Sequence, residues 1–472
     1  MKSVVWFRRD LRVADNRALY HACKHSPDGV IGLYIVTPAQ WREHDDANCK
    51  IRFWMDSLKD LSLQLSKLNI PLCIKTCKDF AKSVDVVVKF ALKNDCESVY
   101  LNREYEVNES RRDAAVKQAC EKQGIQTHAF HDRIIVPPHE IKTKEGKFYS
   151  VFTPYRKVWD TRAAEFFRMS PKPQKQKELG LKSSAVPTQI DGFDLSDFRE
   201  DLWPVGEREA AKRLKKFATR AADYNDARDI PSISGTSLLS PYLNVGAISP
   251  RQCLAAAIEA NGGVIAGAKG PTTWISELTW RDFYTHVLVN VPRVSMNQPF
   301  KLKTKKLNWR DDLSDFNKWC TGQTGYPIVD AGMRQLNRTG WMHNRLRMVT
   351  AMFLTKNLLI DWRLGEQYFM QKLIDGDLAA NNGGWQWSAS TGTDSVPYFR
   401  IFNPFSQSKR FDVDGKFIKK MCPELEPVAA KELHDPAKLS NAISQQGIDY
   451  PDFVVDYKAG RERALKSFKA LN

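Results

Sequence analysis

The sequence predicts an α/β protein with two parts: an N-terminal doubly wound parallel sheet and a C-terminal region made entirely of helices. Three observations lead to this prediction. Short apolar segments alternate with helical patterns over residues 1–131. After about Leu202 the strand signal fades, and helical patterns such as PRQCLAAAIEAN and EQYFMQKLID take its place. The chain of 472 residues is also long enough for two or three domains.

Five short apolar segments are the predicted strands of this Rossmann-like sheet: SVVWFR, VIGLYIV, PLCIKT, SVYLNR and IQTHAF. Helical patterns separate them, and the clearest runs from Ile51 to Leu68 with apolar residues at intervals of three and four. No GxGxxG follows the first strand, and the GxxxxGKS/T pattern is absent from the chain. Any ligand of this domain is therefore expected to bind side chains at the strand ends.

Residues 132–201 are predicted to connect the two parts over the surface, because prolines are mixed there with lysine, glutamine and serine. The predicted domains are then residues 1–131 and residues 202–472. Eight of the thirteen tryptophans fall between Trp274 and Trp387, so the second domain is expected to have an aromatic interior.

The composition limits the class of protein. The formal net charge is +16, and most of the excess lies beyond residue 140, which makes a polyanion one candidate partner. Nine cysteines without CxxC spacing indicate no disulfide framework, and we predict no metal site. The charged start MKSVVWFRRDLR and the lack of a long apolar run indicate an intracellular protein without a membrane span.

The segment DGDLAANNGGWQWSASTG, residues 375–392, combines many polar groups with two tryptophans. Gly383 and Gly384 disfavour a helix here, so we expect a loop. Its buried polar groups need hydrogen-bond partners, and its tryptophans need burial.

Three further segments have an ordinary structural explanation when each is taken alone. WISELTWRDFYTHVL, residues 274–288, predicts an amphipathic helix with a surface Glu–Arg pair. SGTSLLSPYLNVGAIS, residues 234–249, suits either helix capping or phosphate binding at a helix start. In GWMHNRLRMVTAMFL, residues 340–354, the histidine is interpreted as structural.

Arg345 and Arg347 of the last segment point to different faces of the predicted helix, so one of them can reach inward. A buried arginine needs an acidic partner. Asp375 and Asp377 are the candidates.

The order of these motifs resembles that of the photolyase/cryptochrome family: WFRRDLR, GTSLLSPYL, WRDFY, TGYPIVDAGMRQL, GWMHNRLRM, DWRLGE and DGDLAANNGGWQW. The resemblance covers residues 1–470 and is closest to the bacterial class I cyclobutane pyrimidine dimer photolyases. It implies a carbon–carbon lyase that repairs UV-damaged DNA with blue light. Electron transfer would run from photoexcited, reduced FAD to a flipped-out dimer.

The resemblance places FAD in the helical domain. The matching positions are Tyr224, Thr236, Ser237, Leu238, Leu239, Ser240, Trp274, Asn344, Arg347, Asp375, Gly376, Asp377 and Asn381. Leu238 departs from the family pattern, since relatives often carry arginine there. A buried Arg347–Asp375 pair is expected beside the flavin, and Asn381 is expected opposite flavin N5.

Other positions match those that contact the lesion and the DNA: Glu277, Trp280, Arg281, Asn344, Arg345, Met348 and Trp387. The two tryptophans would pack against the dimer, with Met348 lining the cavity, and Glu277 would hydrogen-bond the base edge. The two arginines would contact phosphates at the rim.

The resemblance assigns the catalytic roles to Glu277, to Asn381 and to an electron-transfer chain of Trp385, Trp362 and Trp309. The alternative for the three tryptophans is that they are core residues. In the N-terminal domain, His44, Asn108 and Glu109 match the contacts of a methenyltetrahydrofolate antenna. Met296 stands where a relative has lysine, which leaves a deazaflavin as the other candidate antenna.

Two other functions remain as alternatives. One is a blue-light-sensing cryptochrome, including the type that prefers single-stranded DNA. The other is a flavin- or nucleotide-dependent oxidoreductase. The family expectation is a monomer in the bacterial cytoplasm that needs no protein partner.

Overall fold

The computed structural model describes residues 1–196 and 198–471, and these form two compact units. Unit 1 comprises Met1–Ala222, Ser237–Pro292 and Ile374–Ala379, and unit 2 comprises Asp223–Thr236, Arg293–Leu373 and Ala380–Asn472. Because each unit draws on three separate stretches, the domain boundaries at residues 131 and 201 stay a prediction.

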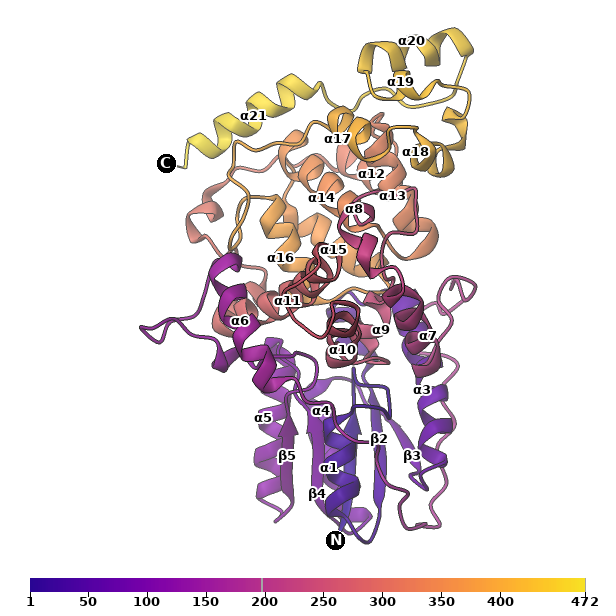
Figure 1. The fold of residues 1–472 in the computed structure, drawn as a ribbon, viewed down its shortest axis with the longest axis vertical. Coiled ribbons are helices and arrows are strands. Elements are labelled where there is room, and N and C mark those ends of the chain that lie inside the picture. The colour runs from indigo at the N-terminus through magenta and orange to yellow at the C-terminus, as the bar shows by residue number, and fades with distance from the viewer. Residues whose placement is uncertain (197, 472) are drawn as a thin grey trace. The chain divides into compact units, whose positions relative to one another are not determined.

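A five-stranded parallel sheet forms the base of unit 1 (Figure 1). Its strands are β1 (Lys2–Phe7), β2 (Val30–Val36), β3 (Leu72–Thr76), β4 (Cys96–Asn102) and β5 (Gln126–Phe130). Their order is β3-β2-β1-β4-β5, and Val5 of the central strand pairs with Gly32 on one side and Tyr100 on the other. The predicted doubly wound parallel sheet is confirmed.

Helices cover both faces of the sheet. The helices between the strands are α1 (Arg17–His25), α2 (Pro38–Glu43), α3 (Asn48–Ser66), α4 (Phe80–Lys93) and α5 (Val107–Glu121). Val87 of α4 and Val116 of α5 pack in one apolar cluster with Val4 of β1. On the opposite face a Cβ at Gly32 would lie 3.3 Å from Phe7 and 3.5 Å from Leu65 of α3. Glycine therefore lets α3 approach the sheet closely.

The predicted connector contains a helix that the sequence analysis missed. After η1 (Pro138–Glu140), α6 runs from Phe152 to Phe166, and Tyr155, Trp159 and Ala163 of its inner face are fully buried. The indole Nε1 of Trp159 donates to Asp282 Oδ2 at 2.9 Å. The spacing of four between these residues was a helical signal, but the surrounding prolines and lysines obscured it.

The remaining helices of unit 1 are α7 (Glu207–Ala218), α9 (Ser240–Val245), α10 (Pro250–Ala260) and α11 (Lys269–Asn290). A buried ion-pair network attaches α10 to the loops at the end of the sheet. Arg251 contacts Asp15 at 2.9 Å and Asp132 at 2.6 Å, and Arg12 contacts the other oxygen of Asp132 at 2.5 Å. Paired charges of this kind stabilise one arrangement only if every partner is present.

Unit 2 is helical, and no strand is found among its described residues. Its elements after α8 (Tyr224–Ala227) are η4 (Leu302–Lys306), α12 (Leu313–Thr321), α13 (Pro327–Thr339), α14 (Asn344–Met352), the π-helix η5 (Phe353–Asn357), α15 (Trp362–Lys372), α17 (Pro404–Phe411), α18 (Lys416–Met421), η6 (Pro423–Leu425), α19 (Ala430–Leu433), α20 (Pro436–Gln446) and α21 (Tyr457–Lys469). One large apolar cluster joins α12 to α18 and contains Trp319, Trp362 and Trp385. The expected aromatic interior is therefore present.

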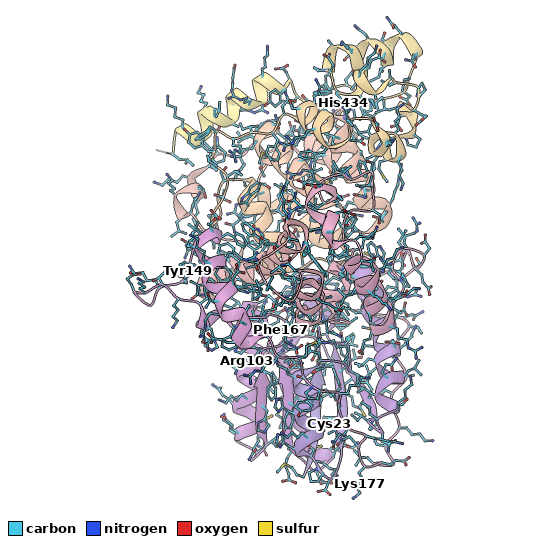
Figure 2. All side chains as sticks on the ribbon, in the orientation of Figure 1. Cys23, Arg103, Tyr149, Phe167, Lys177 and His434 are labelled. Carbon is cyan, nitrogen blue, oxygen red and sulfur yellow. The ribbon has the colours of Figure 1, made fainter. Side chains whose placement is uncertain are left out.

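Three elements cross the boundaries between units: η2 (Ala221–Asp223), η3 (Pro292–Met296) and α16 (Leu378–Ser388). None of the helices in the described ranges has the length and apolar character that crossing a bilayer requires. All nine cysteines are free thiols, and all but Cys49 and Cys77 are buried. Cys23 on α1 is labelled in Figure 2.

Candidate functional site

Charged side chains gather at the carboxyl ends of β1 and β4 in unit 1. Arg9 follows β1, and Glu104 and Glu106 follow β4. The winding direction of the chain reverses between these two strands, which is where open α/β sheets bind ligands. Arg9 Nε lies 2.5 Å from Glu104 Oε1, and Arg9 Nη2 lies 2.6 Å from Glu106 Oε1.

The two glutamates are ionised despite their burial. Burial raises the pKa of Glu106, but the charges of Arg9 and Arg133 outweigh it and bring the pKa to about 2. Burial likewise raises the pKa of Glu104, but the charges of Arg9 and Arg112 outweigh it and hold that pKa well below its usual range. The strand ends therefore hold fixed charges inside the protein.

The three residues assigned to the antenna lie together beside this group. His44 Nε2 is 3.0 Å from the amide nitrogens of both Asn108 and Gln40, and His44 Nδ1 is 3.7 Å from Glu109 Oε1. Burial lowers the pKa of His44, so its ring is neutral. Two amide donors at Nε2 place the ring proton on Nδ1.

Glu109 differs from the other acids in the group. Burial and the negative charge of Glu106 raise the pKa of Glu109 to about 8. Its Oε2 is buried, and no hydrogen-bond partner for it occurs in the part of the chain that the structure describes. A neutral carboxyl with an unused oxygen fits a ligand whose ring edge donates and accepts hydrogen bonds, such as a pterin.

Helix α11 presents four of the residues that the sequence places near the flavin or the lesion. Trp274 is buried against the edge of Phe217, with ring centroids 4.6 Å apart, and Glu277 is half-buried. Trp280 is half-buried and stacks on Phe152 of α6, with centroids 3.6 Å apart and planes 5° apart. Phe152 was missed by the sequence analysis because it lies in the predicted connector.

Arg281 lies within the charged group of unit 1 and is only half-exposed. Its Nη1 donates to the backbone oxygen of Arg133, and burial lowers its pKa. To contact a DNA phosphate at a rim, as expected, the Arg281 side chain would have to extend outwards. Its bond to the backbone oxygen of Arg133 opposes that movement.

The loop before α9 adopts an unusual backbone. Leu238 has φ +53°, a left-handed conformation that disfavours a side chain by about 1–2 kcal/mol. Leu239 N bonds to Ser237 Oγ at 3.4 Å, and α9 starts at Ser240 without a side-chain cap. Ordinary side-chain capping of α9 is therefore not the role of this serine-rich loop. Strain of this kind persists where the surroundings impose it, often at ligand sites.

The segment Asp375–Asp377 is fixed by groups that the sequence analysis did not single out. The backbone oxygen of Gly376 accepts from Lys50 Nζ at 2.6 Å and from Asn244 Nδ2 at 2.9 Å. Both donors are almost fully buried. They lie 326 and 132 residues away along the chain, so no local signal could have found them.

Helix α14 in unit 2 carries Asn344, Arg345 and Met348 on its exposed or half-exposed side, while Leu346 and Val349 face the core. His343 caps this helix by accepting from Arg345 N at 3.2 Å, so its structural interpretation is confirmed.

The acidic partner of Arg345 is Asp229. Its Nη2 lies 2.7 Å from Asp229 Oδ2, and its guanidinium stacks on the ring of Phe411 at 4.3 Å. Asp375 and Asp377 were expected as partners of whichever of the two arginines reaches inward, and the expected Arg347–Asp375 pair stays a prediction. Arg347 Nε donates to Met342 O at 2.8 Å. Tyr224 on α8 lies under the guanidinium of Arg228 at 5.7 Å.

The expectation of a loop at Gly383 and Gly384 was wrong, because α16 continues through both glycines. Side-chain contacts compensate for the two glycines. Asn382 Nδ2 donates to Glu366 Oε1 at 3.0 Å, and Gln386 Nε2 donates back to Asn382 Oδ1 at 2.8 Å. Tertiary contacts thus override a propensity penalty of about 1 kcal/mol per glycine.

The other face of α16 holds Asn381, Gly384 and Trp387, which are half-buried. Asn381 Nδ2 donates to Glu366 O at 3.0 Å, which orients the amide and leaves its carbonyl oxygen as an acceptor. A Cβ at Gly384 would meet no atom within 4 Å. This face suits a flat ring whose edge carries an N–H donor.

The three tryptophans of the expected electron chain lie in unit 2 and differ in burial. Trp385 and Trp362 are buried in the main apolar cluster, and Trp309 is half-buried against its surface. The ring of Trp385 also contacts Phe369 and Trp319, with centroids 4.9 and 5.9 Å apart. Trp309 is therefore the most exposed of the three.

The described residues contain no group of three or more histidine, cysteine or acidic side chains arranged for a metal ion. His21 and His25 do have HxxxH spacing on α1, and their rings stack with centroids 6.0 Å apart. His21 also stacks on Phe130 at 4.6 Å, so packing accounts for its position.

Comparison with known proteins identifies two matching family models. The model described as DNA photolyase matches residues 3–176, and the model described as FAD binding domain of DNA photolyase matches residues 274–470.

Whole-length relatives carry the name deoxyribodipyrimidine photo-lyase. The proteins of Salmonella typhimurium and Escherichia coli are 43% and 42% identical, and each match covers 99% of this chain and 98% of the relative. The protein of Vibrio cholerae is 43% identical, with 99% of both chains covered.

Solved structures agree with these matches. A class III photolyase from Agrobacterium tumefaciens has a TM-score of 0.85 at 34% identity, covering 100% of this chain and 97% of that one. A cryptochrome from Synechocystis has a TM-score of 0.85 at 27% identity, with 99% of both chains covered.

Proposed function

The chain belongs to the DNA photolyase family, and we propose that it uses light to split cyclobutane pyrimidine dimers in UV-damaged DNA. The observation that carries this proposal is identity of 42–43% over almost the whole length of relatives named deoxyribodipyrimidine photo-lyase. The similar cryptochrome structure shares less sequence, 27%, although its fold is equally close. Signalling is therefore the second candidate.

The cofactor of the proposed reaction is FAD, in agreement with the match of residues 274–470 to an FAD-binding domain. Bound and reduced, FAD supplies the electron that splits the dimer after light absorption. The proposed ligands are Tyr224, Thr236, Ser237, Leu238, Leu239, Ser240, Trp274, Asn344, Arg347, Asp375, Gly376, Asp377 and Asn381.

Asn381 illustrates how the protein prepares for this cofactor. Its amide is already oriented by the bond to Glu366 O, so its carbonyl oxygen needs no rearrangement to accept an N–H. An uncharged amide also keeps the same hydrogen-bonding capacity at every physiological pH.

Glu277 and two tryptophans are proposed to hold the flipped dimer. Trp280 is already stacked between α11 and Phe152, so this wall is rigid before the lesion arrives. Trp387 and Met348 would add apolar contacts, and Glu277 would hydrogen-bond the base edge and stabilise the negative charge on the dimer while it is split. Arg281 and Arg345 would contribute phosphate contacts that weaken as salt rises.

A second chromophore is proposed at His44, Asn108 and Glu109, whose neutral histidine and neutral carboxyl fit a pterin edge. Methenyltetrahydrofolate is the first candidate. Met296 cannot pair with a folate carboxylate, so a deazaflavin is the second. We also propose that the protein acts as a monomer in the bacterial cytoplasm.

The decisive experiment is repair of UV-irradiated oligothymidylate by the purified protein in light and in darkness. Loss of dimers only in light, together with flavin absorption, is the expected result. Tight flavin without repair under reducing conditions would contradict the enzyme and favour signalling. Glu277→Ala should lower repair while flavin content is kept.

The tryptophan chain has a separate test. Trp309→Phe should abolish photoreduction of the flavin but leave repair by chemically reduced protein unchanged. Equal loss of repair under both conditions would mean that Trp309 serves the fold rather than electron transfer.

A further inference from the structure

A continuous row of buried ionisable side chains in unit 1 leads from the antenna residue Glu109 to Asp377. Glu109 Oε1 lies 3.8 Å from Arg9 Nη2, and the same Arg9 nitrogen lies 2.6 Å from Glu106 Oε1. That glutamate oxygen lies 3.5 Å from Arg133 Nη1, while Arg133 Nη2 lies 3.0 Å from Asp377 Oδ2. Arg133 Nη1 also lies 3.7 Å from Glu104 Oε1, so one terminal nitrogen faces two glutamates and the other faces Asp377.

The low exposed fractions of these side chains show that their contacts are shielded from solvent. The side chains of Glu106 and Arg133 are each 7% exposed, and that of Asp377 is 16% exposed. Burial alone would raise the pKa of Asp377, but the charges of Arg133, Arg281 and Arg9 together outweigh burial and lower the pKa. Asp377 is therefore ionised, and Arg133 contacts its carboxylate directly.

The backbone around Arg133 is fixed independently of this row. The preceding residue, Asp132, binds Arg12 and Arg251, and the backbone oxygen of Arg133 accepts from Arg281. A guanidinium on an immobile backbone can define the position of a carboxylate that it contacts.

We propose that Arg133 is a positioning residue that holds the Asp377 carboxylate and joins it to the row containing Glu106 and Glu109. The inference rests on the proposed function, in which Asp377 contacts the flavin. A neutral residue at position 133 would release Asp377 and leave it beside Glu106 without the cation between them. Both effects loosen the flavin site without removing any residue that touches the cofactor.

The test measures how fast flavin leaves the holoprotein, from the rise of flavin fluorescence at fixed temperature, with urea unfolding followed in parallel. Arg133→Gln is expected to speed flavin release about tenfold or more, since a charge-assisted bond to Asp377 is lost. Arg112→Gln is the matched control. Arg112 is equally buried and contacts Glu104 and Asp113, so its loss should lower stability without speeding release.

Two further variants separate positioning from folding. Arg133→Lys keeps the charge but not the fork, so its release rate should fall between those of native protein and Arg133→Gln. Adding Arg133→Gln to Asp377→Asn should change the release rate little, because both act through the same contact. Glu109→Gln should alter release in the native background and not in the Arg133→Gln background.

Several outcomes would overturn the inference. Equal release from Arg133→Gln and Arg112→Gln would reduce Arg133 to a structural role. Independent effects of Arg133→Gln and Asp377→Asn would show that the two residues do not act together. If native protein repairs dimers and Arg133→Gln releases flavin at the native rate, this inference is wrong and the proposed function stands. Native protein without flavin defeats the proposed function and this inference together.

Discussion

The sheet end of unit 1 and the core around α16 in unit 2 hold their polar side chains by opposite means. In unit 1 the buried glutamates that follow β4 pair with arginines, as Glu106 pairs with Arg9 at 2.6 Å. Around α16 side-chain amides make the contacts, such as those of Asn382 and Gln386 at 2.8 Å. The first region depends on charge balance, and the second depends on shape.

The buried amine of Lys356 in unit 2 also has neutral partners, a hydroxyl and an aromatic ring. Burial lowers its pKa well below the usual range of lysine. Its Nζ donates to Ser390 Oγ at 2.8 Å and lies 3.7 Å from the ring of Phe468. Substitutions that change charge should therefore affect unit 1 most strongly, and substitutions that change volume should affect unit 2.

The largest effect is expected for Asp132→Asn in unit 1. Asn cannot neutralise Arg12 and Arg251, so the free energy of unfolding should fall by about 3–5 kcal/mol. Burial raises the pKa of Asp132, but the two arginines outweigh it and depress the pKa. Its contribution is thus complete above the unfolded pKa of about 3.9 and is lost as pH falls through the folded pKa.

Urea unfolding at several pH values measures this loss of stability. The difference in free energy of unfolding between native protein and Asp132→Asn should narrow below about pH 4. Asp191→Asn is the control, because its pair with Arg42 is exposed and should contribute little. A gap that stays constant down to pH 2 would mean that the substitution acts through packing.

Gly365→Ala in unit 2 should cause the next largest loss of stability. A Cβ there would lie 2.1 Å from Trp385 Cη2, so either the ring or α15 must move. Overpacking of this kind lowers the free energy of unfolding by about 1–3 kcal/mol. Urea unfolding measures the change at pH 6 and pH 8, and it should be the same at both. A pH-dependent loss would contradict a purely steric cause.

Glu109→Gln should have a smaller effect that depends on pH. The folded pKa of Glu109 is raised to about 8, so its contribution is fully present below the unfolded pKa and is lost as pH rises through 8. The variant should therefore exceed native protein in stability by about 1–2 kcal/mol at pH 8.5 and by less at pH 5. Thermal unfolding at both pH values checks this, and a variant that is weaker at pH 8.5 would refute it.

The smallest effect is expected for Gly384→Ala on α16. The added methyl group meets nothing within 4 Å, so the gain in helix propensity should raise stability by about 0.5–1 kcal/mol. Chemical denaturation of flavin-free protein measures this gain in stability. Gly365→Ala is the comparison, because it adds the same methyl group at a crowded position. Faster flavin loss from the variant would indicate that the cofactor lies against this face.

Sequence patterns predicted the regular parts of this protein well. All five strands occur where the apolar segments stand, and the pattern from Ile51 to Leu68 corresponds to α3, Asn48–Ser66. Periodicity also predicted α11 and the helical nature of unit 2. These predictions succeed because local backbone geometry and one-sided burial both leave a period in the sequence.

The failures share a different cause. α16 passes through two glycines because the side chains of Asn382 and Gln386 bond to each other and to Glu366, which propensity does not record. Helix α6 in the predicted connector was missed although its Trp159 bonds to Asp282, which lies 123 residues away along the chain. In each case contacts distant in sequence outweighed a local preference.

By itself, then, the sequence determined the fold class, the strand and helix positions, and through its motifs the family. Tertiary structure alone decided which charges meet: Arg133 with Asp377, and Lys50 with the carbonyl of Gly376. The reason is physical. Backbone and burial preferences act on neighbouring residues and repeat along the chain, whereas an ion pair needs only two atoms in contact and leaves no period between them.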